Sequence, residues 1–504
     1  MAEQFLHGVE VLEIDTGPRP IRTVRSGVIG IVGTAQNSAP ATAATLTLGR
    51  AADNNALLFT APAGLAGNQV SINLVDPAAN SAALAVAVSG NAITVTLATS
   101  VAGAITSTAG DIITAIAGDA DAAALVTASN VTGSDGTGVV RATGVSRFLT
   151  GGADEPFPLN TPKLVAGSRG EAAALGIGGT LAAAMDGIFD QIGAAVVVVR
   201  VAEGADEAAT LANVIGGVNG TTGQLEGVHA LLGAESAVGV APRILIAPGY
   251  THQRPDGGAN PVVAELLGIA ERMRAIIVAD GPSTTDEAAI AYRQDWGSKR
   301  VYVIDPRVTT FNGVTTLERV SARTAGAIAR TDHDLGFWWS PSNKLINGIT
   351  GTERSIDFKL GDVNSRANIL NENEIATIIR QDGFRLWGNR TTSSDPKWAF
   401  LSVVRTADII ADSLQRAHLW AVDRNITKTY VEDVVEGVNA YLRTLTNLGA
   451  ILGGECWADP DLNTPANIAQ GKVYFNFDFT PPYPAEHVTF RSQLVNDYIT
   501  EVFS

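Results

Sequence analysis

Four short segments that are apolar at almost every position constrain the fold more than any other feature of the chain. They cover residues 194–201, 243–247, 275–279 and 300–304. A strand that is apolar throughout has to be covered on both faces, as in a parallel sheet between layers of helices. Helical patterns at residues 261–273 and 285–296, the second with Thr284 and Glu287 at capping-box spacing, alternate with these strands. We therefore predict an α/β middle domain with a mostly parallel sheet over residues 154–339.

A second region, residues 41–152, differs sharply in composition from the rest of the chain. It contains no Lys, Trp or Tyr and is rich in Ala, Thr, Gly, Ser and Val. Alternation of apolar and polar residues predicts half-buried strands, which are expected at residues 56–60, 69–74 and 91–97. An amphipathic pattern over residues 111–126 predicts a short helix. These features predict a separate, small β-rich domain at residues 40–153.

The last third of the chain has two helical patterns followed by one strand pattern. The helix expected within residues 398–423 has an apolar stripe formed by Val403, Ala407, Ile410, Leu414, Ala417 and Ala421. The helix expected within residues 430–448 has a stripe formed by Val431, Val435, Val438, Leu442 and Leu445. For this second helix, Thr429 and Glu432 have capping-box spacing, and Gly449 can end it. Strict alternation over residues 472–479 then predicts a strand with four large apolar residues on one face, namely Val473, Phe475, Phe477 and Phe479.

Charge and motif content argue against several classes of function. The net charge of −16, with no basic run, disfavours nucleic-acid binding, which needs an excess of Lys and Arg on one face. Gly30 and Gly33 lack the spacing of a phosphate-binding loop, and no G-x-S-x-G sequence places a nucleophilic serine. The six histidines are scattered, and His333, between two acids, is expected at a charged helix end. We therefore predict no catalytic residue, no metal site and no cofactor.

The sequence also gives no sign of a membrane segment. The longest apolar run, residues 194–199, is far shorter than the roughly 20 residues that a membrane-spanning helix needs. The N-terminus lacks a basic segment followed by an apolar one, so no secretory signal is expected. Cys456 is the only cysteine, which excludes an internal disulfide. We expect a soluble product that has no membrane partner.

Both ends of the chain contain a β-prone segment that prolines separate from the body. Residues 5–14 precede a Gly-Pro-Arg-Pro break at residues 17–20, and residues 487–491 follow a proline-rich stop at residues 481–484. Proline cannot continue a hydrogen-bonded ladder, so each end is attached through a stiff, extended linker. Such terminal strands commonly fold back onto their own sheet. They can also be added to the sheet of another subunit, and the residues alone leave both possibilities open.

Several segments, taken in order, resemble the tail sheath proteins of contractile-tailed bacteriophages. The resemblance rests on residues 5–11, 19–21, 157–162, 340–344, 386–391, 478–482 and 484–486. It covers nearly the whole chain except residues 41–152. In ordinary sheath proteins the segments on either side of this region lie close together, so the resemblance implies that residues 41–152 are an insertion. Each motif is weak by itself, but seven in one order make a specific match.

The resemblance implies a homo-oligomeric subunit of stacked hexameric rings around a tail tube, with baseplate and tail terminator proteins as further partners. It implies localisation in the virion tail after assembly in the host bacterial cytoplasm. It also implies an α+β core built from residues 21–39 and 340–485, with arms at residues 1–20 and 486–504. The alternative is the sheath of a bacteriocin-like or secretion-type contractile machine.

In that family the arms cross to neighbouring subunits. The resemblance therefore implies strand exchange, and not that the terminal strands fold back onto their own sheet. The N-terminal arm would contribute Phe5, Leu6, Val9, Val11, Leu12 and Ile14. The C-terminal arm would contribute Val488, Phe490, Leu494, Tyr498 and Val502. The receiving strand would be residues 472–479. Polar residues of the two long helices are the candidates for contact with the tube, namely Arg405, Asp408, Asp412, Glu432, Asp433 and Arg443.

Overall fold

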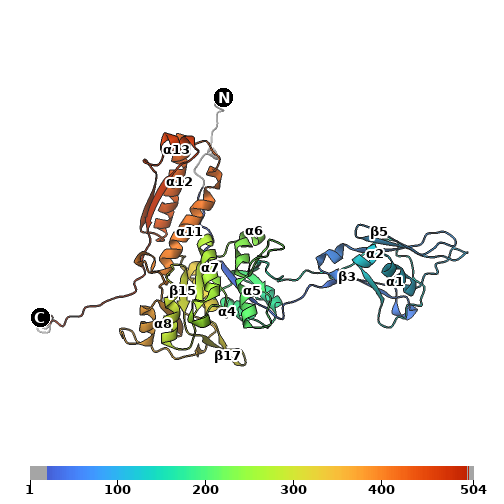
Figure 1. The fold of residues 1–504 in the computed structure, drawn as a ribbon, viewed down its shortest axis with the longest axis horizontal. Helices are drawn as coiled ribbons and strands as arrows, with labels where there is room; N and C mark the ends of the chain where they lie inside the picture. The colour runs from blue at the N-terminus through green and yellow to red at the C-terminus, as the bar shows by residue number, and fades with distance from the viewer. Residues whose placement is uncertain (1–19, 497, 499–504) are drawn as a thin grey trace, which may run out of the picture. The chain divides into compact units, whose positions relative to one another are not determined.

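The computed structural model describes residues 20–496 and residue 498, and the chain divides into two compact units (Figure 1). Unit 1 consists of Met1–Gln36, Leu159–Ala173 and Ile177–Ser504. Unit 2 consists of Asn37–Pro158 and Ala174–Gly176. Within the described part of the chain, no helix is both long and apolar enough to cross a lipid bilayer.

An eight-stranded sheet forms the centre of unit 1. Its order is β20 (Phe384–Trp387), β19 (Ile375–Arg380), β15 (Val301–Ile304), β14 (Ile276–Asp280), β13 (Ile244–Ile246), β1 (Ile29–Thr34), β10 (Ala195–Val201) and β9 (Lys163–Ala166). The six inner strands are parallel, and the two edge strands run antiparallel to their neighbours. All four strands predicted from their apolar runs are present, as β10, β13, β14 and β15.

Three strands of this sheet, β1, β19 and β20, come from residues 21–39 and 340–485, which we expected to form an α+β core domain distinct from the α/β middle domain. For these strands that expectation was wrong. β1 pairs in parallel with β10 and β13, and all six of its residues are buried. β19 pairs in parallel with β15, and it carries β20 at the sheet edge. The physical reason is that β1 and β19 are themselves apolar enough to be covered on both faces, so the α/β layer can bury them.

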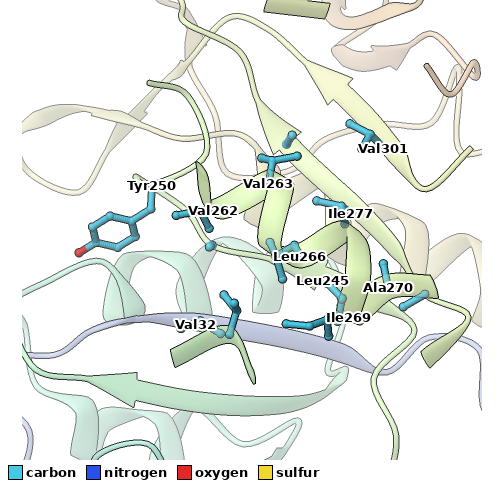
Figure 2. Packing of buried hydrophobic residues seen from close by; sticks show 14 of the residues in the cluster. Val32, Leu245, Tyr250, Val262, Val263, Leu266, Ile269, Ala270, Ile277 and Val301 are labelled. Carbon is cyan, nitrogen blue, oxygen red and sulfur yellow. The ribbon is translucent and has the colours of Figure 1, made fainter. Parts of the chain in front are cut away.

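Helix α7 (Pro261–Met273) covers one face of this sheet (Figure 2). Its side chains Val263, Leu266 and Ile269 pack in the same buried cluster as Leu245 and Ile277 of the strands. Helix α9 (Ser321–Asp334) contacts β1, β13 and β14 and contributes nothing to that cluster, so it lies on the other face. The two helices exclude water from both sides of the inner strands, which explains why those strands are apolar throughout.

The helix starts differ from the predicted capping boxes by one or two residues. Helix α8 (Asp286–Gln294) begins after Thr285, whose Oγ1 accepts a hydrogen bond of 3.1 Å from the Ala288 N–H. Helix α12 (Lys428–Asn447) begins after Thr427, whose Oγ1 accepts one of 3.1 Å from the Tyr430 N–H. In both cases a neighbouring threonine takes the cap, because the first extended residue before the helix decides which side chain can reach the free N–H groups. Gly449 follows α12 at φ +74°, as a C-terminal cap requires.

The remaining elements of unit 1 are short, apart from the helix α11 that lies beside α12. The other helices are α3 (Arg169–Ala172), α4 (Leu181–Phe189), α5 (Glu207–Ile215), α6 (Ala234–Val238), α10 (Arg366–Glu372), α11 (Leu401–Ala417) and α13 (Pro465–Ala469). The other strands are β11 (Gly217–Val218), β12 (Leu225–Glu226), β16 (Val308–Phe311), β17 (Thr315–Glu318), β18 (Gly351–Thr352), β21 (Gly453–Ala458) and β22 (Phe475–Thr480). Helices α11 and α12 share a second buried cluster, which includes Ile410 and Leu442.

Unit 2 has two small sheets and two short helices around its own core. One sheet has the order β2 (Ala43–Leu48), β3 (Leu57–Ala63), β7 (Thr127–Asn130), and the other has the order β5 (Ala85–Ser89), β6 (Ala92–Thr96), β4 (Ser71–Val75), β8 (Arg147–Phe148). The helix predicted at residues 111–126 is split into α1 (Ala109–Gly118) and α2 (Ala120–Leu125). Asp119 causes the break, because its Oδ1 caps α2 by accepting a hydrogen bond of 2.9 Å from the Ala122 N–H.

Candidate functional site

Strands β21 and β22 form a two-stranded antiparallel sheet beside α12. The register runs from Gly453 opposite Thr480 to Ala458 opposite Phe475. β22 begins at Phe475, so Val473 of the predicted strand lies before it. A two-stranded sheet of six residues per strand is marginal by itself, and its free edges offer main-chain groups to further strands.

The free edge of β22 is formed by the residues that the alternating sequence pattern singled out. The N–H of Asp459 donates to the carbonyl of Tyr474 at 3.0 Å, which fixes the phase of the ladder. Since antiparallel pairs alternate, Asn476 and Asp478 also face β21, whereas the N–H and C=O groups of Phe477 and Phe479 point to the opposite edge. No described strand pairs with that edge. The rings of Phe477 and Phe479 stack with centroids 6.2 Å apart, and Phe477 is 38% exposed.

The outer edge of β21 is closed by a side chain of α12. Asn439 Oδ1 accepts a hydrogen bond of 2.7 Å from the Cys456 N–H, and Asn439 Nδ2 donates one of 2.9 Å to the Cys456 carbonyl. The carboxamide therefore takes the place of a neighbouring strand in the middle of this edge. Cys456 is buried, and burial raises the pKa of its thiol to about 11. The accessible edge of the sheet is that of β22.

The N-terminal segment reaches this part of the molecule along α11 and α12. The N–H of Val24 donates to Ser413 Oγ at 3.0 Å, and Thr23 Oγ1 lies 3.0 Å from the hydroxyl of Tyr441. Val24 also packs against the cluster shared by the two helices. The residues predicted for the N-terminal arm, Phe5, Leu6, Val9, Val11, Leu12 and Ile14, lie outside the described residues. The structure thus describes the anchor of the arm and not the arm itself.

The C-terminal segment is fixed up to Glu486. The Glu486 carboxylate accepts a hydrogen bond of 2.8 Å from Arg390 Nε, and this bond raises the pKa of Arg390. The ring of Tyr483 packs edge-on against Phe400, with centroids 6.2 Å apart. Beyond this point residues 487–496 are exposed and have no strand or helix (Figure 1).

The predicted side chains of the C-terminal arm have no apolar cover within the described structure. Phe490 is 92% exposed, Leu494 97%, Tyr498 71% and Val488 63%, and Val502 lies outside the described residues. Large apolar side chains gain free energy when they are buried, at about 25 cal/mol per Å² of apolar area. A segment with this alternation and this exposure is suited to burial against another chain.

Three of the six residues predicted to contact a tube are buried, so for them that prediction was wrong. Arg405 pairs with Asp332 on α9, and each side chain is 4% exposed. Asp408 pairs with Arg300, and Asp412 accepts contacts of 2.6 Å from two further arginines, Arg243 and Arg274. The charged face of α11 lies against unit 1's own sheet layer, so it cannot face a partner. Glu432, Asp433 and Arg443 of α12 are exposed and remain candidates.

Sequence reasoning missed these ion pairs, although the sequence contains a signal for them. Arg243, Arg274 and Arg300 stand within two residues of the starts of β13, β14 and β15, which are neighbours in the sheet. The amino ends of adjacent parallel strands lie side by side, so these arginines form one positive group. Asp408 and Asp412, four residues apart on one helix face, match it. The pairing fixes α11 to the sheet.

At the opposite, carboxyl edge of the sheet, where α/β domains commonly bind ligands, two buried aspartates are hydrogen-bonded by neighbouring serines. Asp280 accepts hydrogen bonds from Ser321, 2.8 Å from its N–H and 2.6 Å from its hydroxyl. Asp305 accepts one of 2.6 Å from the Ser283 N–H. Burial raises the pKa of Asp280, and it raises the pKa of Asp305 to about 7. No group of three His, Cys, Asp or Glu residues in the described structure is placed to hold a metal ion.

Two family models match consecutive parts of this chain. The phage tail sheath protein central domain matches residues 223–392, and the phage tail sheath C-terminal domain matches residues 393–495. The chain belongs to the phage tail sheath family. The boundary at residue 392 lies just beyond β20, which agrees with the assignment of β19 and β20 to the α/β layer. α11, α12 and the β21–β22 sheet fall within the C-terminal domain.

Named relatives of this sheath protein come from phages and a prophage. A prophage major tail sheath protein of Pseudomonas aeruginosa is 46% identical over 71% of this chain and 92% of its own length. The tail sheath protein of Escherichia phage P2 is 37% identical over 69% and 88%. That of Burkholderia phage BcepMu is 32% identical over 99% and 98%. About three tenths of the chain is therefore unmatched in the first two relatives and matched in the third.

Solved sheath structures share the fold. The helical sheath of the anti-feeding prophage in its contracted state matches with a TM-score of 0.53 and 21% identity, over 66% of this chain and 88% of that chain. The sheath of an extracellular contractile injection system, also contracted, matches with a TM-score of 0.52 and 16% identity, over 69% and 89%. The chain is a tail sheath protein with the mixed α/β architecture of contractile injection systems.

Proposed function

We propose that this chain polymerises as stacked hexameric rings around a tail tube and contracts to drive the tube through the host envelope for genome delivery. The observation that carries the proposal is the free edge of β22 in a chain of this family. A sheath that stores its work at assembly needs no nucleotide, so the proposed role is structural and not enzymatic. Contraction is then a movement of near-rigid subunits into a lattice with more buried contact.

The arms are proposed to hold neighbouring subunits together by strand exchange. Residues 5–14 and 487–503 of neighbouring subunits extend the sheet beyond β22, where main-chain hydrogen bonds supply affinity. Because Asn439 closes the edge of β21, one arm pairs with β22 itself and the second arm pairs with the first. Ladders reached through extended, proline-containing linkers persist while the bodies rotate. They also outweigh the mutual repulsion of subunits that each carry a net charge of −16.

The first test removes the N-terminal arm. Electron microscopy of the purified parent chain is expected to reveal tubes, and a variant without residues 1–15 is expected to form none. A matched control replaces residues 1–15 by a Gly/Ser segment of equal length, which keeps the chain length but offers no apolar side chains, and it should also fail to polymerise. A parent chain that stays monomeric at high concentration, or a deletion variant that polymerises as well as the parent, contradicts strand exchange.

The second test acts on the receiving edge alone. In Phe477→Pro the lost N–H points to the free edge, so the β21–β22 ladder is kept and the monomer stays folded. Polymerisation should be lost, because the added strand loses a partner and meets the proline ring. Phe477→Val keeps the N–H and should polymerise, which separates the backbone effect from loss of the ring. Tubes formed by Phe477→Pro as readily as by Phe477→Val would exclude this edge as the receiving one.

Contact with the tail tube is assigned to the exposed face of α12. Glu432 and Asp433 lie in its first two turns, and Arg443 lies about three turns further along and pairs with Glu436 on the same helix. Their exposure and their place in the C-terminal domain support this assignment. Reversal of both acids, Glu432→Lys with Asp433→Lys, should abolish co-assembly with the tube protein and leave tubes of the sheath protein alone intact. Equal co-assembly by parent and variant would remove α12 as the contact.

The proposed site of action is the virion tail, after assembly in the cytoplasm of the host bacterium, with baseplate and tail terminator proteins at the two ends of the sheath. Neither nucleic acid nor a membrane is a proposed partner. A second candidate function is the sheath of a bacteriocin-like or secretion-type machine, which the fold shared with the anti-feeding prophage favours. Purified particles that contain this chain should carry DNA-filled heads in the first case. Headless particles would establish the second.

A further inference from the structure

Unit 2 contains a cavity of about 270 Å³ that lies outside the proposed assembly surface. Four apolar side chains form part of its wall, namely Leu48, Leu57, Leu74 and Val140. Arg50 and Arg141 line the same cavity. Ligand sites combine an apolar wall with a few polar groups that fix orientation, and their volumes begin near ~300 Å³ for drug-sized molecules. This cavity therefore suits a ligand smaller than a typical drug.

The charge distribution of unit 2 makes the two arginines conspicuous. Residues 37–158 contain seven Asp, one Glu, no Lys and only three Arg, so the unit is acidic. Two of its three basic residues nevertheless line one cavity, where Asp53 is the single acid. Neither Arg50 nor Arg141 has an ion pair or a side-chain hydrogen bond among the described residues. Their guanidinium groups are free to bind an anion from outside.

A buried side chain holds the two arginine-bearing segments together. Asn55, which is 7% exposed, accepts a hydrogen bond of 2.9 Å from the Arg50 N–H through Oδ1. Its Nδ2 donates one of 2.8 Å to the carbonyl of Val139, two residues before Arg141. Thr143 then joins the second segment to β4, because its Oγ1 accepts a hydrogen bond of 3.1 Å from the Leu74 N–H. The backbone of the two segments that carry Arg50 and Arg141 is thus held in place before any ligand arrives, which lowers part of the entropic cost of binding.

We propose that this cavity binds a small organic oxyanion, a carboxylate or a phosphate monoester with a short apolar chain. The arginine forks would contact the oxygens, since guanidinium matches carboxylate and phosphate geometry with two parallel hydrogen bonds. The apolar chain would lie against Leu48, because Leu57, Leu74 and Val140 are at most 4% exposed and form the floor behind it. The site is independent of polymerisation, because it uses no residue of the arms, α12 or β22.

Isothermal titration calorimetry on the full-length chain tests the proposal with four probes. Hexanoate and hexyl phosphate carry the oxyanion, and the stronger of the two identifies its type. Hexanamide and hexanol have the same chain without charge and should bind at least about tenfold more weakly, because a charge-assisted hydrogen bond contributes about 1.5–3 kcal/mol. Arg50→Gln and Arg141→Gln should each weaken binding of the anion about tenfold.

Arg147→Gln is the matched control, since Arg147 is the third arginine of unit 2 and does not line the cavity. It changes the net charge of the unit by the same amount and should leave affinity within about twofold. All three positions are exposed, so each variant should keep the melting temperature of the parent. The proposal is overturned if the parent binds neither anion, if the uncharged probes bind equally well, or if Arg147→Gln weakens binding as much as the other two variants.

Discussion

Asp408 and Arg300 form a buried ion pair, so removal of one partner leaves a charge that water cannot reach. Both side chains are at most 10% exposed. Asp408→Ala should therefore lower the free energy of unfolding by about 2 kcal/mol, less than the cost of an uncompensated buried charge, because Arg300 keeps an ion pair of 3.1 Å with the more exposed Glu271. Urea unfolding followed by fluorescence measures this. Glu432→Ala, on the exposed face of α12, should change it by less than ~0.5 kcal/mol, and equal effects of the two variants would contradict a structural role for the pair.

His252 predicts how stability depends on pH. Burial, with the positive charges of Arg319 and Arg307, lowers its pKa to about 4 from 6.5. Between these pH values the unfolded chain binds a proton at His252 and the folded chain does not. The stability contributed by neutral His252 is therefore present above pH 6.5 and is lost as pH falls to 4. His252→Asn cannot titrate, and its unfolding free energy should fall by about 2 kcal/mol less over this window. Unfolding curves at several pH values measure the two slopes, and equal slopes would contradict the low pKa.

The residues of α11 show which single-residue environments the sequence predicts and which it does not. The apolar stripe through Val403 and Ile410 followed from helical spacing, because the signal lies within a few turns of one helix. The environment of Arg405 did not, because its partner Asp332 is 73 residues earlier in the chain. A charged helix face looks the same in sequence whether water, a tube or an internal arginine covers it. Only the strand order, which brings the arginines before β13, β14 and β15 together, separates these cases.

At the scale of elements, Asn439 couples α12 to the small sheet that the arms are proposed to extend. Asn439→Ala leaves the N–H and C=O of buried Cys456 without partners, which should cost about 2 kcal/mol of unfolding free energy. Asn447→Ala, on an exposed position of the same helix, should cost less than ~0.5 kcal/mol. Thermal unfolding of both variants measures the difference. If Asn439→Ala is as stable as Asn447→Ala, the edge of β21 does not depend on this side chain.

Elements were predictable where one local pattern decided them. Strands β10, β13, β14 and β15 are continuous apolar runs, and α7 has Asn260 as its cap and Pro261 at its first position. β1 was not predicted, because Gly30 and Gly33 interrupt its apolar run. Both glycines serve close packing. A Cβ on Gly30 would lie 2.9 Å from Pro242, and one on Gly33 would clash with the hydroxyl of Thr180. A glycine in a strand often marks such a close approach.

At the scale of the whole molecule, the ends of unit 2 meet. Thr42 and Ala153 exchange two main-chain hydrogen bonds, of 2.8 and 3.1 Å. Two glycines can therefore replace residues 43–152 without displacing the flanking chain, and the large sheet keeps every one of its strands. The variant should unfold with the same midpoint as unit 1 in the parent and should still form tubes, because the arms and β22 are untouched.

Electron microscopy and scanning calorimetry together decide this last prediction. A folded variant that forms no tubes would place unit 2 within the lattice contacts. A variant that does not fold would mean that unit 1 depends on unit 2, against the separate cores of the two units. Tubes of unchanged lattice would instead make unit 2 a surface attachment. Its acidic charge would then keep packed tubes apart, and its two cavity arginines would remain available to a ligand from solution.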